Sequence, residues 1–343
     1  MFQLHLHTFR AIAITGVVTQ HCMDSISWDL ENLVHTMLIA AIYEASVWFT
    51  FISGFLFQHL SPKFTVAKYY KAKLRNVVAP YLIMSIPALI ISTFVIHQDN
   101  VPPSFYDLPA RERIVAFILT GKHLAPFWYI PVIVLFFIAG PLFIRLDRAK
   151  WPYLFLIPLS IVSIWLGRDG FQGLMGGYTF WAPPSKALYL LAPYMFGMFC
   201  SRYHDRLLTM TKAEVGGIAL IALIAYIVNV DSAYAGASGG PLFVFKMVTC
   251  PLVVWGAYRL NDNVAERFGI IATYSFGIYF THGYLLAFLN RVAPYTVLGA
   301  IFEHGGVIAW VALTATVILA CCLVLSTAKK YVLGSSSRLV TGV

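Results

Sequence analysis

Ten apolar segments, each close to the length that crosses a lipid bilayer, recur along this chain. Only 11% of the residues are charged and 59% are hydrophobic, whereas soluble domains carry about 25% charged residues. This composition excludes a soluble enzyme. The sequence therefore predicts an all-α fold, a polytopic integral membrane bundle of about ten transmembrane helices.

The predicted spans cover residues 6–25, 38–58, 76–97, 125–146, 151–167, 185–201, 213–230, 240–258, 268–290 and 306–327. The first span carries Arg10 and has no cleavage-site pattern, so we interpret it as a retained helix and not as a signal peptide. Together the spans predict a single transmembrane domain over residues 1–343, which ends in a short basic tail at 328–343.

Lysine and arginine residues fall unequally on the two sides of these spans. With a cytoplasmic N-terminus, sixteen of them lie in cytoplasmic loops and the tail, and six lie on the opposite face. The asymmetry predicts that both termini are cytoplasmic. The net charge of +9 comes from short basic runs between apolar segments, as this rule requires. Nucleic acid is therefore not expected as a partner.

The five cysteines fall in or beside apolar segments and form no CxxC motif. Their spacing fits neither a metal site nor a disulfide framework. We expect all five to be packing residues, and we expect no metal in the site. The residues are Cys22, Cys200, Cys250, Cys321 and Cys322.

The first span places Arg10 near its cytoplasmic end and His21 eleven residues later. Eleven residues make about three helical turns and about 16 Å of rise, so the two side chains share a face at different depths. A guanidinium can bind phosphates, and an imidazole can act as a general base or accept an acyl group. Alternatively, Arg10 extends to the interface and His21 bonds a neighbouring helix. The spacing alone leaves both interpretations open.

The second span runs back toward the cytoplasm and carries Glu44 at about the depth of His21. A carboxylate there could orient the imidazole and stabilise its charged form, or it could pair with a base in an outer loop. Ser53 and Gly54 lie near the depth of Arg10. Gly54 permits close helix packing or leaves room for a ligand chain. We expect Ser53 to contact a co-substrate bound at this depth.

The residues after the second span form a basic run that includes Lys71, Lys73 and Arg75. A polyanionic co-substrate such as an acyl-CoA would be attracted to this cytoplasmic rim, and so would anionic lipid headgroups. Both remain possible on the sequence alone. Of the two, we expect these three residues to bind the polyanionic co-substrate.

His282 lies about as deep in the ninth span as His21 does in the first. We therefore expect His21, Glu44 and His282 to form the catalytic cluster. Polar and aromatic residues at span ends, or inside spans, are candidates for binding the acceptor substrate: His123, Trp128, Tyr129 and Tyr279. Lys246, inside the eighth span, could pair with an acidic group of either substrate or serve as a helix-packing ion pair.

Taken in order, these elements resemble the membrane-bound acyltransferase family 3. They are the Arg10-x10-His21 pair in FRAIAITGVVTQH, the FxSGF-like stretch at 51–55, the basic run ending in Arg and Pro at 75–80, WYIP at 128–131 and SFGIYFTH at 275–282. The resemblance implies a bundle of about ten helices that moves an acyl group from cytoplasmic acyl-CoA to an acceptor, commonly a surface polysaccharide or glycolipid. It also implies that His21 is the catalytic histidine and that Arg10 contacts the donor.

The chain departs from this family in one respect. Many members carry a glutamate shortly after the WYIP-like element, whereas this chain reads PVIVLFF at 131–137. Because this glutamate is missing, we expect Glu44 to be the acidic partner of His21. We also expect no extracellular hydrolase-like domain of the kind fused to some members.

The predicted function is therefore membrane-bound O-acylation in the plasma (inner) membrane of a bacterium. The acyl group is acetyl by default, with succinyl possible, and the acceptor is a hydroxyl of a saccharide or glycolipid; membrane lipids surround the protein. The alternative is an exporter or flippase of a polysaccharide or lipid-linked saccharide that breaks no bond. Such a transporter would show paired spans broken by glycine or proline, whereas Pro87, Pro131, Pro193 and Pro251 are scattered.

Overall fold

The computed structural model describes residues 4–29, 31–234, 239–260 and 262–342, and every regular element in these ranges is a helix. The predicted all-α class is therefore confirmed. The chain forms two compact units, which combine segments far apart in the sequence. Unit 1 comprises Met1–His59 and Pro193–Val324, and unit 2 comprises Leu60–Ala192 and Leu325–Val343.

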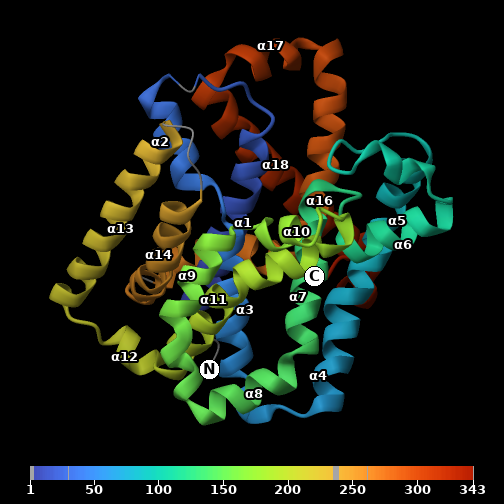
Figure 1. Cartoon of the computed structure of the whole chain (residues 1–343). Coiled ribbons are helices and arrows are strands. Elements are labelled where there is room, and N and C mark those ends of the chain that lie inside the picture. The colour runs from blue at the N-terminus through green and yellow to red at the C-terminus, as the bar shows by residue number, and fades with distance from the viewer. Residues whose placement is uncertain (1–3, 30, 235–238, 261, 343) are drawn as a thin grey trace. The chain divides into compact units, whose positions relative to one another are not determined.

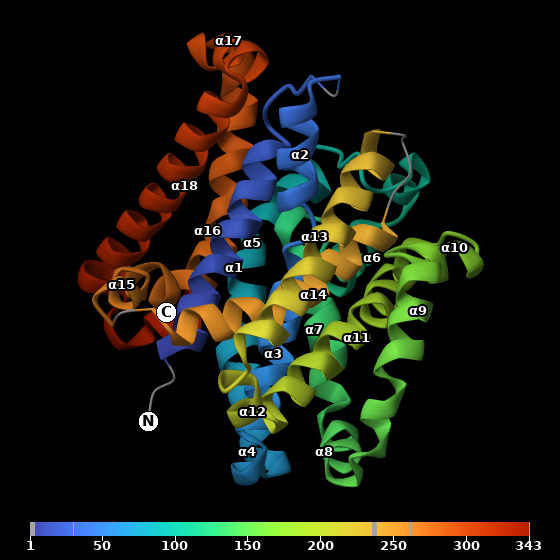
Figure 2. The ribbon, with the colours of Figure 1, turned by 90° about the vertical axis from the view of Figure 1, so that its left-hand side faces the viewer.

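Unit 1 holds the first three helices and most of the second half of the chain (Figure 1). Its helices are α1 (Leu4–Met23), α2 (Leu33–Ile42), α3 (Ser46–His59), the end of α11 (Ala182–Arg202), α12 (His204–Leu208), α13 (Lys212–Tyr234), α14 (Gly240–Tyr258), α15 (Asp262–Arg267), α16 (Gly269–Val292), α17 (Val297–His304) and most of α18 (Gly306–Ala328). Helix α1 packs against α16, α14 and α3, as Figures 1 and 2 both show.

Unit 2 begins with one long helix made of α4 (Val66–Lys73), a π-helical turn (Leu74–Val78) and α5 (Ala79–Phe94). It continues with α6 (Ala110–Thr120), a 3-10 turn (Ala125–Trp128), α7 (Tyr129–Ile138), α8 (Gly140–Ala149), α9 (Leu156–Leu166), α10 (Gly170–Leu174), the start of α11 and, from the tail, α19 (Ser337–Val340).

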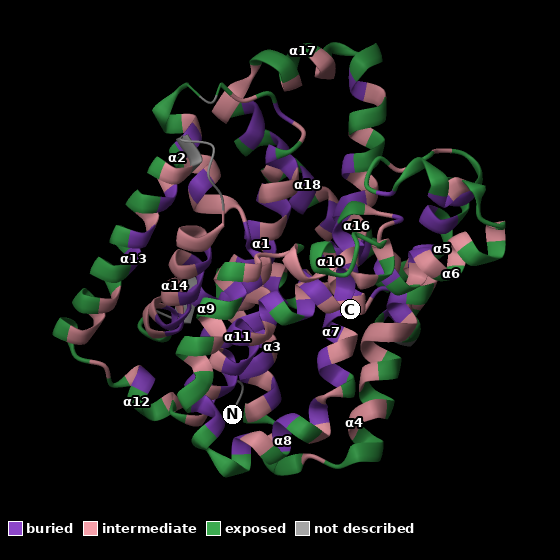
Figure 3. Cartoon of the chain, viewed as in Figure 1, coloured by how far each residue is buried: buried purple, intermediate pink, exposed green. Residues whose placement is uncertain are grey.

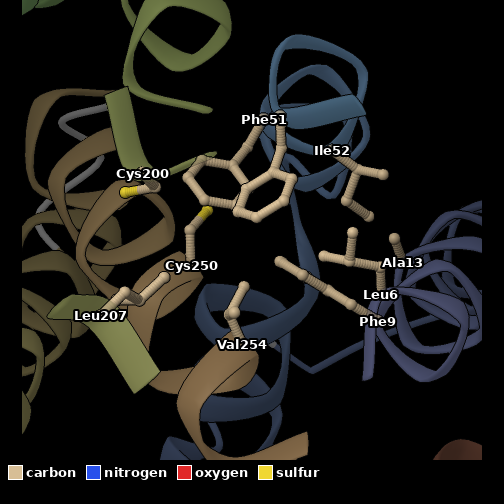
Figure 4. Close-up of a cluster of buried hydrophobic side chains, with 10 residues drawn as sticks. Leu6, Phe9, Ala13, Phe51, Ile52, Cys200, Leu207, Cys250 and Val254 are labelled. Carbon is tan, nitrogen blue, oxygen red and sulfur yellow. The ribbon is translucent and has the colours of Figure 1, made fainter. Parts of the chain in front are cut away.

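A cluster of buried apolar side chains joins α1, α3 and α14 in unit 1 (Figure 4). Phe9 and Phe51 are fully buried there, with ring centroids 5.9 Å apart. Cys200 and Cys250 belong to the same cluster, which confirms the predicted packing role for these two thiols. The cluster fixes the side of α1 that faces α3, so the other sides of α1 are available to α16.

Helices α3 and α11 approach each other backbone to backbone within unit 1. A Cβ atom at Gly54 would lie 1.9 Å from the carbonyl oxygen of Tyr194, and one at Gly197 would lie 2.0 Å from that of Phe51. Any larger residue would force the helices apart. The packing interpretation of Gly54 is therefore the one that the geometry supports.

Five helical stretches of the described residues are long and apolar enough to cross a membrane: Leu33–His59, which combines α2 and α3, Val66–Phe94, Lys212–Ser232, Gly240–Tyr258 and Gly306–Leu333. Three bent pairs raise the number to eight if each pair is one span. Helices α1 and α11 have spanning length, 20 and 21 residues, but are less apolar. Most residues of the Lys212–Ser232 span are not buried in the protein (Figure 3). Only 11% of its apolar stretch is buried. A helix surface that is both apolar and exposed is stable in contact with lipid. The protein is therefore an integral, multi-pass membrane protein.

The predicted single span at 125–146 is wrong. The structure has two helices there, α7 and α8, each bent relative to a different neighbour: α7 by 69° to α6, and α8 by 98° to the helix that follows it. Pro141 lacks the N–H that a continuous helix needs, and a Cβ at Gly140 would lie 2.9 Å from the Tyr69 ring. The stretch between the predicted spans 76–97 and 125–146 contains a further helix, α6.

Candidate functional site

His21 and His282 lie together in unit 1, with ring centroids 5.5 Å apart and ring planes inclined by 37°. His21 stands near the end of α1, where its side chain is 19% exposed. His282 stands in α16 and is fully buried. The predicted meeting of these two histidines is therefore present in the structure.

The carboxylate that accompanies His21 belongs to Asp24, three residues later on the chain. The Nδ1 atom of His21 lies 3.5 Å from Oδ2 of Asp24. The hydroxyl of Tyr43 donates to the other carboxylate oxygen, Oδ1, over 2.5 Å. Because Nδ1 faces the acid, Nε2 is the ring atom of His21 that can act as a base.

The ring of His282 is held by its own helix. Its Nδ1 lies 2.8 Å from the carbonyl oxygen of Ile278. A carbonyl only accepts, so Nδ1 carries the hydrogen and Nε2 carries a lone pair. Nε2 is buried and has no hydrogen-bond partner within the described residues. Buried ring nitrogens without a hydrogen-bond partner are rare in protein interiors. This nitrogen is therefore a candidate acceptor of a hydrogen bond from a substrate.

Arg10 contacts the same helix at the other end of the site. Its Nη2 donates to the hydroxyl of Ser275 over 3.0 Å, and Ser275 is buried. Since Ser275 precedes His282 on α16 as Arg10 precedes His21 on α1, the two helices run in the same direction. Along their shared face they present a guanidinium at one level and two imidazoles at another.

Tyr279 and Ser53 have different surroundings in unit 1. Tyr279 is buried, and its ring centroid lies 6.3 Å from that of His282, so it lines the histidine pair. The hydroxyl of Ser53 donates to the carbonyl oxygen of Phe49 within α3. The predicted donor contact of Ser53 stays a prediction.

Glu44 does not lie inside a helix, as the sequence suggested. The helix stops after Ile42 and restarts at Ser46, and Glu44 lies in this break with φ at +64°. The buried ammonium of Lys246 donates to the carbonyl oxygens of Ala41, at 2.6 Å, and Ile42, at 3.3 Å. These are terminal carbonyls of α2, which the helix cannot satisfy itself.

Lys246 also interacts electrostatically with Glu44, and its ammonium lies 4.0 Å from the centroid of the Trp48 ring. Of the two interpretations of Lys246, the geometry supports helix packing, since the ammonium stabilises the break between α2 and α3. A catalytic part for Glu44 stays a prediction.

In unit 2 a basic pocket of about 350 Å³ opens beside the start of the long helix. It is lined by Lys68, Lys71, Ala72, Arg75, Asn76 and, from the tail, Arg338. Lys73 points elsewhere, with its ammonium 4.3 Å from the centroid of the Phe137 ring. Lys68, Lys71 and Arg75 are spaced three and four residues apart and so share one face of the helix, whereas Lys73 lies on another.

The remaining candidates also belong to unit 2. His123 is buried, with Nδ1 3.1 Å from the carbonyl oxygen of Phe117 and Nε2 2.9 Å from the hydroxyl of Ser85. Both ring nitrogens are occupied, so His123 joins α5 to the turn that follows α6. Trp128 lies under two cationic side chains, and Tyr129 packs edge-on against it with ring centroids 5.9 Å apart.

The family model of the acyltransferase 3 family, described as an acyltransferase domain, matches residues 4–327. The chain belongs to the acyltransferase 3 family. The match runs through both units and includes the histidine pair, Arg10 and most of the basic pocket. No curated protein and no solved structure gives a significant match to this chain.

Sequence reasoning missed three residues: Asp24 and Tyr43, beside the histidine pair of unit 1, and Arg338, in the basic pocket of unit 2. Asp24 had a readable signal, because residues three apart on a helix are neighbours and His21 is followed at that spacing by an acid. Tyr43 and Arg338 had none, since each reaches its partners through the fold.

Proposed function

We propose that this family member transfers a short acyl group from acyl-CoA to a hydroxyl group of a saccharide or glycolipid, in the inner membrane of a bacterium. Acetyl is the default group, and succinyl is the next choice. The observation that supports the proposal is the histidine pair. Asp24 lies beside the imidazole of His21, and Nε2 of His282 is buried with a lone pair that no described residue uses.

In the proposed reaction His21 is the general base. Its Nε2 takes the proton of the acceptor hydroxyl while the hydroxyl oxygen attacks the thioester carbonyl carbon. The carbon–sulfur bond then breaks, and the leaving thiolate takes the proton back from the imidazolium. Asp24 stabilises this imidazolium through Nδ1. A route through an acyl-imidazole would use the same Nε2 atom.

His282 has a separate part in this scheme. With its hydrogen on Nδ1, its Nε2 can only accept a hydrogen bond. It can therefore accept from the acceptor substrate and orient it toward His21, whose ring centroid lies 5.5 Å away. Positioning of this kind contributes to rate by fixing the angle of attack.

The donor is proposed to bind through its phosphates. Arg10 offers a guanidinium, which binds phosphate through paired N–H groups. The basic pocket offers Lys68, Lys71, Arg75 and Arg338, and none of the described residues that line it is acidic. Acyl-CoA carries phosphates at two places, so two separate cationic groups match its chemistry.

The test compares the surface saccharides of bacterial cells that produce the wild-type protein, His21→Ala or His304→Ala, by mass spectrometry. His304 is the matched control, because its side chain is 76% exposed. We expect acylated saccharide with the wild type and the control, and none with His21→Ala. An exporter would instead change the amount of saccharide at the surface without changing its mass, and that result would refute the proposal.

A further inference from the structure

The end of helix α2, which packs against α13 (Figure 1), is held by side chains of two other helices of unit 1. The side-chain amide of Asn229, in α13, donates to the carbonyl oxygen of Ala40 over 3.1 Å. The ammonium of Lys246, in α14, donates to the carbonyl oxygens of Ala41 and Ile42. Both side chains are buried. They bind the last three carbonyls of α2, which a helix cannot satisfy from within.

The peptide group between Ile42 and Tyr43 is held on both of its edges. Its carbonyl oxygen accepts from the ammonium of Lys246 over 3.3 Å. Its N–H donates to the carbonyl oxygen of Ile39 over 3.1 Å. Because a peptide group is planar, two hydrogen bonds on opposite edges fix the orientation of the whole plane. The Cα atom of Tyr43 lies in this plane, so the position of Tyr43 depends on Lys246.

The chain leaves the helical conformation directly after this peptide group. Tyr43 has ψ at 153°, and Glu44 has φ at +64°. Beyond the break, the indole N–H of Trp48 donates to the hydroxyl of Thr249 over 3.0 Å. Thr249 lies on α14 three residues after Lys246. Helix α14 therefore binds the chain on both sides of the break between α2 and α3.

Tyr43 connects this break to the carboxylate beside the histidine pair. Its hydroxyl donates to Oδ1 of Asp24 over 2.5 Å, and Oδ2 of the same carboxylate lies 3.5 Å from Nδ1 of His21. Asp24 follows the last residue of α1, and its side chain is 44% exposed. A side chain so exposed keeps its rotamer freedom unless a partner restrains it. The hydroxyl of Tyr43 supplies this restraint.

We propose that Lys246 is a positioning residue for the acyl transfer. It fixes the peptide group between Ile42 and Tyr43, and with it the place of the Tyr43 hydroxyl. This hydroxyl in turn holds the Asp24 carboxylate beside His21. The inference rests on the proposed function, in which Asp24 stabilises the imidazolium of His21. Lys246 acts through the backbone of α2 and not on the reacting atoms.

The first test observes the hydrogen bond between Tyr43 and Asp24 without any substrate. A 3-fluorotyrosine is placed at position 43 of the purified full-length protein in lipid nanodiscs, and its fluorine resonance is recorded by NMR. Asp24→Ala gives the resonance of a phenol that has lost this bond. We expect Lys246→Met to move the resonance at least half of the way to the Asp24→Ala value, because methionine resembles lysine in size but cannot donate a hydrogen bond.

Two more variants separate the position of Tyr43 from general stability. Val254→Ala is the matched control, because Val254 is fully buried in the same helix as Lys246 and packs in the apolar cluster of unit 1. It should destabilise the fold through a cavity and leave the fluorine resonance unchanged. Asn229→Leu removes the hydrogen bond to Ala40 and should move the resonance in the same direction as Lys246→Met. It tests the inference even where Lys246→Met does not fold.

The second test asks whether Lys246 and Tyr43 affect the reaction through the same interaction. The rate of acetyl transfer per mole of folded protein is measured in vesicles for Lys246→Met, Tyr43→Phe and the double variant. We expect each single change to lower kcat by up to about fivefold and to leave acetyl-CoA affinity unchanged. The double variant should have the kcat of Tyr43→Phe, whereas independent effects would multiply.

Three results would overturn the inference. They are an unmoved fluorine resonance in Lys246→Met, a shift as large in Val254→Ala, and losses of kcat that multiply in the double variant. Failure of the proposed function is a different result: the resonance moves as expected, but the wild-type protein leaves surface saccharides without acyl groups. Acylated saccharides together with an unmoved resonance would refute only the positioning by Lys246.

Discussion

Replacing Asp24 by Asn tests the role of the carboxylate that faces His21. The change keeps the size of the side chain and removes its charge. If Asp24 stabilises the imidazolium that forms during transfer, kcat should fall while the affinity for acyl-CoA stays the same, because this imidazolium forms only after acyl-CoA has bound.

The size of the effect follows from the geometry. At the observed 3.5 Å between Nδ1 and Oδ2, a full charge pair is worth about 5 kcal/mol at an effective dielectric constant of about 20 and about 1 kcal/mol in water. The Asp24 side chain is 44% exposed, so solvent screens the pair strongly. We therefore expect Asp24→Asn to raise the activation free energy of transfer by about 1–2 kcal/mol, which corresponds to a kcat about 5- to 30-fold lower.

The assay follows transfer of radiolabelled acetyl from acetyl-CoA to the saccharide acceptor in membrane vesicles. Asp29→Asn is the control, because it removes the same charge from the same connecting segment without touching His21. Tyr43→Phe removes one hydrogen bond to the Asp24 carboxylate and should lower kcat by about fivefold or less. A kcat for Asp24→Asn within twofold of that of Asp29→Asn would refute the reasoning.

Three further changes test other parts of the structure. Arg10→Ala should weaken acyl-CoA binding about tenfold or more, and Arg10→Lys should recover only part, because an ammonium cannot reproduce the guanidinium fork; equal affinities in calorimetric titration would contradict the donor role. Lys246→Met should destabilise the fold by about 2–4 kcal/mol, since two helix-end carbonyls and Glu44 lose their cation; an unchanged thermal midpoint would contradict this. Gly54→Val should lower the yield of folded protein, because its Cβ would meet a carbonyl oxygen of the facing helix at 1.9 Å; Gly217→Val, whose Cβ would meet no atom within 4 Å, should not.

The histidine pair could be anticipated from the sequence because depth along a straight helix is proportional to residue number. His21 and His282 lie in α1 and α16, two helices that start close to where the apolar pattern places them. Polar residues in apolar helices are also few, so each one draws attention. Arg10 was found by the same reasoning.

The same reasoning failed where a helix is broken. Glu44 was assigned a depth on a continuous helix, but the backbone turns at this residue with φ at +64°. Nothing local marks the break, because what stabilises it is Lys246, about two hundred residues later in the sequence. The span expected at 125–146 failed similarly, although the Gly140–Pro141 pair there was a visible signal.

Long-range pairing also explains why the basic pocket was only half anticipated. Lys71 and Arg75 could be recognised from their charge and their place in the sequence. The helical period separates them from Lys73, which faces Phe137 instead. Arg338 joins them from the tail, and no periodicity relates residues so far apart.

The most direct test of the central claim is the rate of acetyl transfer by His21→Ala, measured in vesicles alongside His304→Ala, with acetyl-CoA binding to both variants measured by calorimetry. If His21 is the base of the reaction, its replacement should lower the rate by about 10²-fold or more and leave acetyl-CoA affinity unchanged. Equal rates of acetyl transfer by the two variants would contradict the account.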